Sequence, residues 1–173
     1  MRMRFCVSLV AISFVAIILL TSAAVAQQSV APRARLKIPA PNGQEWRVRV
    51  ALDRRAKGSA ARSVKVIAAM AGAMVVVDTY PSRAGGMHLC QAGEESFLRV
   101  FRTTKYKATE TFHEKLESCR DNIELASPGL QWTAETKTLN VEWLSSPGKA
   151  GQGGKQKLEV GANAGVKSIA DWR

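Results

Sequence analysis

Apolar and polar residues alternate along much of the chain between residues 45 and 144. The segment EWRVRVAL (45–52) shows this most clearly, with apolar side chains at every second position and Arg47 and Arg49 between them. A period of two predicts a β-strand with one buried face and one face in water. The same alternation predicts two further strands, over 97–102 and 106–116.

Two apolar runs rich in valine lie at 63–70 and 74–80, on either side of Ala71-Gly72-Ala73. β-Branched residues favour strands, and a glycine between two such runs favours a tight turn. We therefore predict two core strands joined by a turn. An alanine-rich helix over 59–74 is the competing prediction.

The segment LQWTAETKTLNVEWL (130–144) gives the clearest hairpin pattern, because two alternating runs flank a short polar turn. Shorter strands are predicted at 87–91, 123–125 and 157–160. Strands that recur every 8–12 residues indicate an all-β or β-dominated α+β domain, built as a small antiparallel sandwich or barrel. The pattern does not determine the order of the strands within a sheet.

The first 26 residues have the features of a secretory signal peptide. Arg2 and Arg4 precede an apolar stretch, and Ala24-Val25-Ala26 has the small residues that signal peptidase accepts. We therefore expect a periplasmic or secreted protein. The alternative is an uncleaved segment that anchors the chain in the inner membrane, since about 22 residues without a charge are long enough to span a bilayer.

Composition divides the rest of the chain into three parts. Residues 27–44 contain three prolines and three cations, and they predict an extended basic arm. Residues 45–144 form the predicted β-rich globular domain. Residues 145–173 begin with a glycine-rich stretch, which predicts a flexible linker followed by a C-terminal tail.

Two cysteines, Cys90 and Cys119, remain after removal of the signal peptide. An even pair in an exported protein predicts a disulfide. With His88 and His113 the same cysteines would give four potential zinc ligands, but their spacing matches no usual zinc module. We therefore predict no metal and no cofactor.

Positive charge is concentrated near the start of the predicted mature chain. Residues 27–65 contain ten cations and two acidic residues, a surplus of eight, whereas residues 90–144 contain seven cations and nine acidic residues. A basic segment binds anions. The predicted partners are an anionic envelope polymer, a lipid headgroup or an acidic protein, and nucleic acid is not expected outside the cytoplasm. The candidate binding residues are Arg47, Arg49, Arg54, Arg55, Lys57 and Arg62.

No motif for catalysis is present, and no catalytic residue is predicted. The sequence therefore favours an exported, non-catalytic binding protein, comparable to inhibitor or immunity proteins only by analogy. One alternative is a small envelope hydrolase that uses His113 or the carboxylates of Glu94 and Glu95. Another is a structural protein that pairs with a second chain through a strand edge. The sequence predicts no oligomeric state.

Overall fold

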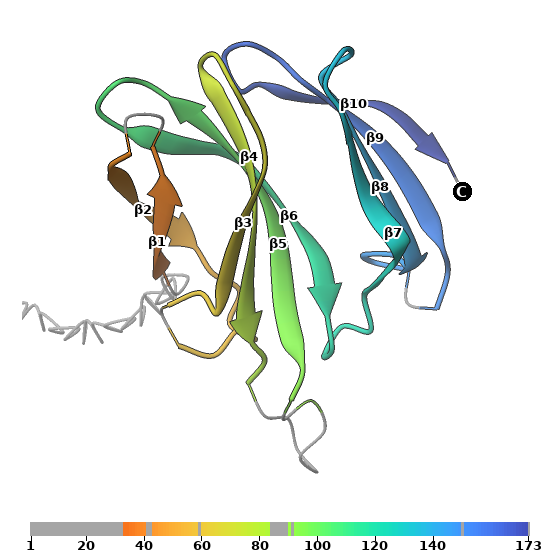
Figure 1. Ribbon diagram of the computed structural model, residues 1–173. Coiled ribbons are helices and arrows are strands. Elements are labelled where there is room, and N and C mark those ends of the chain that lie inside the picture. The colour runs from red at the N-terminus through yellow and green to blue at the C-terminus, as the bar shows by residue number, and fades with distance from the viewer. Residues whose placement is uncertain are drawn as a thin grey trace, which may run out of the picture.

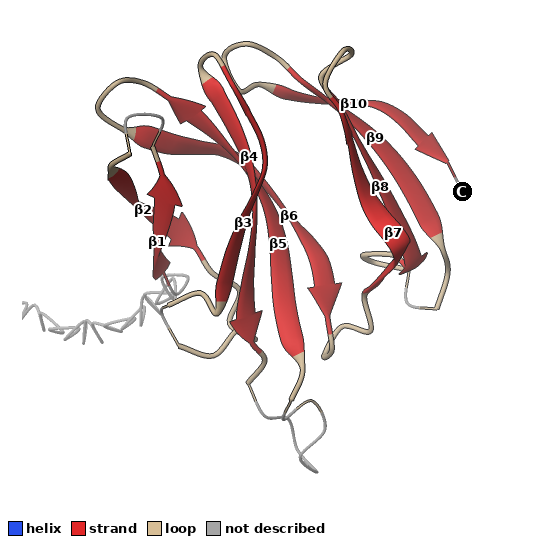
Figure 2. Cartoon of the chain, viewed as in Figure 1, coloured by secondary structure: helices blue, strands red, loops and turns tan. Residues whose placement is uncertain are grey.

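The chain is organised as three layers of antiparallel β-structure (Figure 1). The computed structural model describes residues 33–40, 43–58, 60–83, 90, 92–149 and 151–172. Strands dominate this part of the chain, and no helix occurs among the described residues (Figure 2). Accordingly, these residues contain no helix capable of crossing a membrane.

An N-terminal hairpin and two four-stranded sheets make up the layers. The hairpin consists of β1 (Arg33–Pro39) and β2 (Glu45–Ala51). The central sheet has the order β3-β4-β5-β6, with β3 (Ser63–Met70), β4 (Ala73–Pro81), β5 (Glu94–Thr103) and β6 (Ala108–Ser118). The third sheet has the order β10-β9-β8-β7, with β7 (Glu124–Thr133), β8 (Thr138–Ser145), β9 (Gly154–Val160) and β10 (Val166–Trp172).

The two inner strands of the central sheet, β4 and β5, are covered on both faces, which explains why their side chains are almost continuously buried. Successive side chains on a strand point to opposite faces. Val76 and Phe101 therefore pack in one core with the hairpin. Val75 and Leu98 pack in a second core with the third sheet. Figure 1 shows the hairpin and the third sheet on opposite sides of the central sheet.

The structure confirms the predicted all-β antiparallel class. The two valine-rich runs are strands β3 and β4, joined at Gly72 by a tight turn, so the helix alternative over 59–74 is wrong. Gly72 has a φ of +80°, and a Cβ at this position would lie 2.6 Å from the carbonyl oxygen of Ala162. Glycine is therefore required at this turn.

At both ends of the described chain, the structure differs from the organisation that the sequence predicts. Residues 33–39, assigned to the basic arm, form β1, because Ala34, Leu36 and Ile38 are buried at every second position. In the segment assigned to a linker and tail, β9 and β10 complete the third sheet. The signal peptide and most of the predicted strand at 87–91 lie outside the described residues.

Strand β7 also extends further than the sequence predicts. The pattern predicts a short strand at 123–125 and a separate hairpin from residue 130, but β7 runs continuously through Ser127-Pro128-Gly129 to Thr133. The pairing with β8 shifts between Leu125 and Leu130, and the Ser127–Pro128 peptide bond is cis. Because β7 is an edge strand, it accepts a proline, which would interrupt the hydrogen bonding of an inner strand.

Candidate functional site

The outward side of the β1–β2 hairpin presents a group of cations, which we call the basic face. It consists of Arg33, Arg35 and Lys37 on β1 and Arg47 and Arg49 on β2. All five are exposed, and they alternate with buried apolar residues on both strands. The five side chains therefore project from the side of the hairpin that faces away from the core.

The strand register places these cations opposite one another. Arg35 pairs with Arg49, and Lys37 pairs with Arg47. Directly opposed side chains have Cβ atoms about 4.5–5.5 Å apart, and like charges at this separation destabilise the strand pair. Within the described part of the chain, the basic face has one salt bridge, between Lys37 and the exposed Glu45 at 3.8 Å. Most of its charge is therefore available to an external anion.

A groove of about 680 Å³ includes four of the five cations of the basic face. It is lined by Arg33, Arg35, Leu36, Lys37, Arg47 and Ala60. Alternate residues on a strand are about 6.6 Å apart, so the outward cations of β1 form a row with this repeat. This row and the groove together provide an extended cationic surface.

The opposite side of the hairpin attaches it firmly to the central sheet. Leu36, Ile38 and Val50 are at most 1% exposed and belong to one core with Tyr80 and Phe101. The inward residues fix the direction of the outward ones, because side chains alternate along a strand. The basic face is therefore presented on a rigid support.

A buried arginine links the end of β2 to the central sheet. The Arg99 Nε donates to both carboxylate oxygens of Asp78, at 2.7 and 2.9 Å, and Nη1 donates to Glu110 at 2.5 Å. Nη2 donates to the carbonyl oxygen of Ala51 at 2.9 Å. Both Arg99 and Asp78 are fully buried. This cluster connects β2 with β4, β5 and β6.

The electrostatics of this cluster keep the arginine charged. Burial alone would lower the pKa of Arg99, but the negative charges and hydrogen bonds of Asp78 and Glu110 outweigh it and raise the pKa. Burial also raises the pKa of the neighbouring Tyr80 hydroxyl, and the nearby Asp78 adds to this increase. Arg99 is therefore a permanent cation with two carboxylate partners.

A second charged cluster holds the loop that follows β2. Lys115 Nζ donates to Asp53 at 2.6 Å and to Asp121 at 2.7 Å. The guanidinium of Arg55 also contacts Asp121. Burial raises the pKa of Asp53, but the hydrogen bonds from Lys115 and the Arg55 backbone and the charges of both residues outweigh it. The net result is a lowered pKa. Arg55 is therefore partly neutralised within the protein.

The six binding residues that the sequence suggests do not form one surface in the structure. Arg47 and Arg49 belong to the basic face, whereas Arg62 forms a 2.7 Å salt bridge with Glu94 and Arg55 contacts Asp121. Arg54 and Lys57 are exposed on the loop between β2 and β3.

Three residues of the basic face were absent from the suggested set: Arg33, Arg35 and Lys37. The alternation in RARLKIP is the signal that identifies them, since it has the same period as EWRVRV. The three prolines of the surrounding segment favoured an irregular arm instead.

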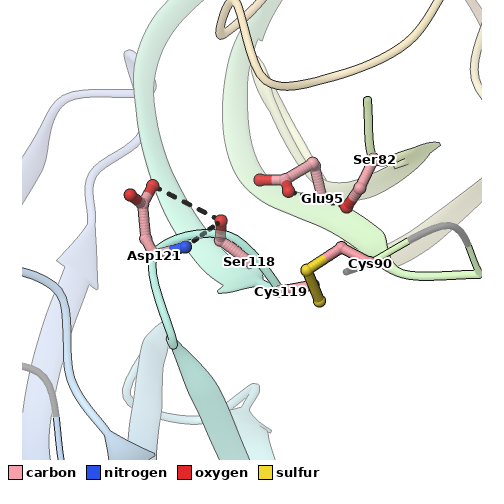
Figure 3. The surroundings of a disulfide bond; sticks show 6 residues. All are labelled: Ser82, Cys90, Glu95, Ser118, Cys119 and Asp121. Atoms are coloured by element: carbon pink, nitrogen blue, oxygen red, sulfur yellow. Dashed lines mark hydrogen bonds between the residues drawn. A yellow bond between two sulfur atoms is a disulfide. The ribbon is translucent and has the colours of Figure 1, made fainter. Parts of the chain in front are cut away.

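The predicted disulfide between Cys90 and Cys119 is present, with Cα atoms 5.8 Å apart (Figure 3). It joins the connection between β4 and β5 to the end of β6. Gly93 packs against it, because a Cβ at this position would lie 2.6 Å from the Cβ of Cys119. The bond leaves neither cysteine as a free thiol, which removes the basis for a cysteine nucleophile or a zinc site that includes both cysteines.

The alternative catalytic residues do not form a common site. Glu94 is exposed and bound to Arg62, whereas Glu95 is fully buried and accepts a 2.7 Å hydrogen bond from Ser82 (Figure 3). His113 is half exposed, with Nδ1 3.4 Å from the carboxylate of Glu110. His88 lies outside the described residues. Among the described residues, no group of three potential metal ligands occurs.

Comparisons with known proteins identify no relative of this chain. A scan against models of protein families, a search of curated proteins and a search of solved structures each found no match.

Proposed function

We propose that this protein is an exported, non-catalytic binding protein that holds an extended anionic polymer of the cell envelope on its basic face. The observation that carries the proposal is the register of the hairpin, which places Arg35 opposite Arg49 and Lys37 opposite Arg47. A strand pair requires only polar residues on its outward side. Opposed cations repel one another, and an external polyanion would relieve that repulsion.

The composition of the basic face favours a polymer over the other two predicted partners. Besides the five cations, the outward residues of the hairpin are Pro39, Glu45 and Ala51. Surfaces that insert into a lipid interface combine cations with large apolar side chains, which these positions lack. Stable protein interfaces also contain an apolar or aromatic centre, and none is present here. Repeated charges along a groove suit a partner whose own charges repeat.

Binding to soluble polyanions at several salt concentrations tests the proposal. The probes are long-chain polyphosphate and polygalacturonate, with phosphatidylglycerol vesicles and an acidic peptide as comparisons. Affinity for a polyanion falls linearly with the logarithm of salt concentration, and the slope reports the number of cations in contact. We expect binding to the two polymers and a steep decrease between 50 and 300 mM NaCl.

A charge-matched pair of variants localises the binding. Arg35→Thr/Arg49→Thr removes two opposed cations of the basic face, and Arg120→Thr/Lys167→Thr removes two exposed cations elsewhere. We expect the first variant to reduce the salt slope by roughly 1.5 and the affinity at low salt by at least tenfold. The control variant should retain most of both. Equal losses in the two variants, or an affinity independent of salt, would contradict the proposal.

A further inference from the structure

A second concave site lies at one end of the central sheet, and the disulfide lies at the other end. It is a pocket of about 380 Å³, lined by Trp46, Met70, Ala71, Gly72, Thr103, Thr104 and Lys105. These residues come from the start of β2, the β3–β4 turn and the β5–β6 turn, which Figure 1 shows at the same end of the molecule. None of them belongs to the basic face.

Hydrogen bonds between and within the turns shape the pocket in advance. The backbone N–H of Thr103 donates to the carbonyl oxygen of Gly72 at 3.0 Å, which joins the β5–β6 turn to the β3–β4 turn. The Thr104 hydroxyl accepts from the backbone N–H of Lys107 at 3.2 Å and donates to the Lys107 carbonyl oxygen at 3.2 Å. A binding site that is largely formed without its ligand loses little conformational entropy on binding.

The walls are mainly apolar, and the pocket has one charged residue. Trp46, Met70 and Ala71 supply carbon surface, and the Met70 side chain adapts readily to an apolar guest. Lys105 is exposed, with its Nζ 5.5 Å from the centre of the Tyr106 ring, and no carboxylate is among the lining residues. The site therefore combines an apolar cavity with a cation.

The volume limits the size of the apolar guest. A cavity of about 150 Å³ holds benzene, so about 380 Å³ accommodates roughly ten to fifteen non-hydrogen atoms. We infer that this pocket binds a single-chain anionic amphiphile, with its apolar chain against Trp46 and Met70 and its anionic group at Lys105. This site does not depend on the proposed polyanion binding.

Calorimetric titration of the full chain with decanoate tests the inference, with decanol and decyltrimethylammonium as neutral and cationic comparisons. We expect saturable binding of one decanoate per protein and weaker binding of the other two compounds. Lys105→Gln should weaken decanoate binding about two- to fivefold, the range expected for an exposed charge pair, and leave decanol binding unchanged. Lys167→Gln, an exposed lysine in the third sheet, is the matched control and should bind decanoate as the parent does.

Two variants separate this pocket from other modes of binding. Ala71→Trp occupies the pocket from an exposed turn position and should abolish decanoate binding without loss of stability in urea. Arg35→Thr/Arg49→Thr should leave decanoate binding intact, because no residue of the basic face lines the pocket. The polyanion proposal and this inference can therefore fail independently. Absence of binding at 1 mM decanoate, equal binding of all three compounds, or unchanged binding by a folded Ala71→Trp protein would overturn the inference. Binding only to phosphatidylglycerol vesicles would also overturn it.

Discussion

The basic face should destabilise the folded protein in the absence of a ligand, and Arg35→Thr/Arg49→Thr should relieve this cost. The two arginines are register partners. We take the separation of their charges as about 8 Å, because the long side chains can diverge from Cβ atoms about 5 Å apart. At that distance two unit charges in water repel by about 0.5 kcal/mol. Each arginine also lies near other cations of the same face. Threonine suits an exposed strand position, so the substitution introduces no opposing cost from strand propensity.

We expect the variant to be more stable than the parent by about 0.5–1 kcal/mol in 10 mM salt. In 1 M salt the Debye length falls from about 30 Å to about 3 Å, and the difference should disappear. Urea unfolding at both salt concentrations measures the two free energies. A variant that is less stable than the parent at low salt would refute the reasoning. That result would mean that the arginine side chains stabilise the hairpin by more than their charges repel.

Three further predictions concern the disulfide, the buried Arg99 and the carboxylate of Asp53. Removal of the disulfide by Cys90→Ser/Cys119→Ser should lower the unfolding free energy by about 3–4 kcal/mol, since the bond closes a loop with a sequence separation of 29. Urea unfolding of the double variant measures this loss, and the parent unfolded with a reductant should lose a similar amount. Arg99→Met should cost about 3–5 kcal/mol because it leaves the buried Asp78 without its cation, and Arg99→Met/Asp78→Leu should recover most of this loss. A double variant no more stable than the single one would show that the charge of Asp78 is not the source of the cost. The lowered pKa of Asp53 means that the folded state favours the carboxylate over the protonated acid. The stabilisation by this carboxylate is therefore complete above the ordinary pKa of 3.8, and it is lost as the pH falls through the lowered pKa. The stability difference between the parent and Asp53→Asn, followed by urea unfolding, should therefore shrink between pH 6 and pH 2, and a constant difference would contradict this assignment.

The order of the layers accounts for the two kinds of strand pattern in the chain. Outer strands such as β2 have one wet face, so Arg47 and Arg49 alternate clearly with buried residues. Inner strands such as β4 are covered on both sides, so their alternation disappears and a continuous apolar run, residues 73–77 in β4, takes its place. A pattern of this kind indicates a strand but does not say which residues face which layer. The alternation of Val75 and Val76 between two different cores is therefore visible only in the structure.

The amino-acid sequence by itself determined the β class, the Cys90–Cys119 pair and the concentration of positive charge before residue 65, because each depends on residue type and local spacing. Only the tertiary structure decided which cations act together. Arg55 and Arg62 have carboxylate partners from the turn after β6 and from β5, respectively, whereas Arg35 and Arg49 face each other on one hairpin. The physical reason is that charge neutralisation depends on distances between atoms, and these distances are set by strand register and layer packing across dozens of residues. The basic face is thus a product of the fold, built from an alternation that the local sequence already contains.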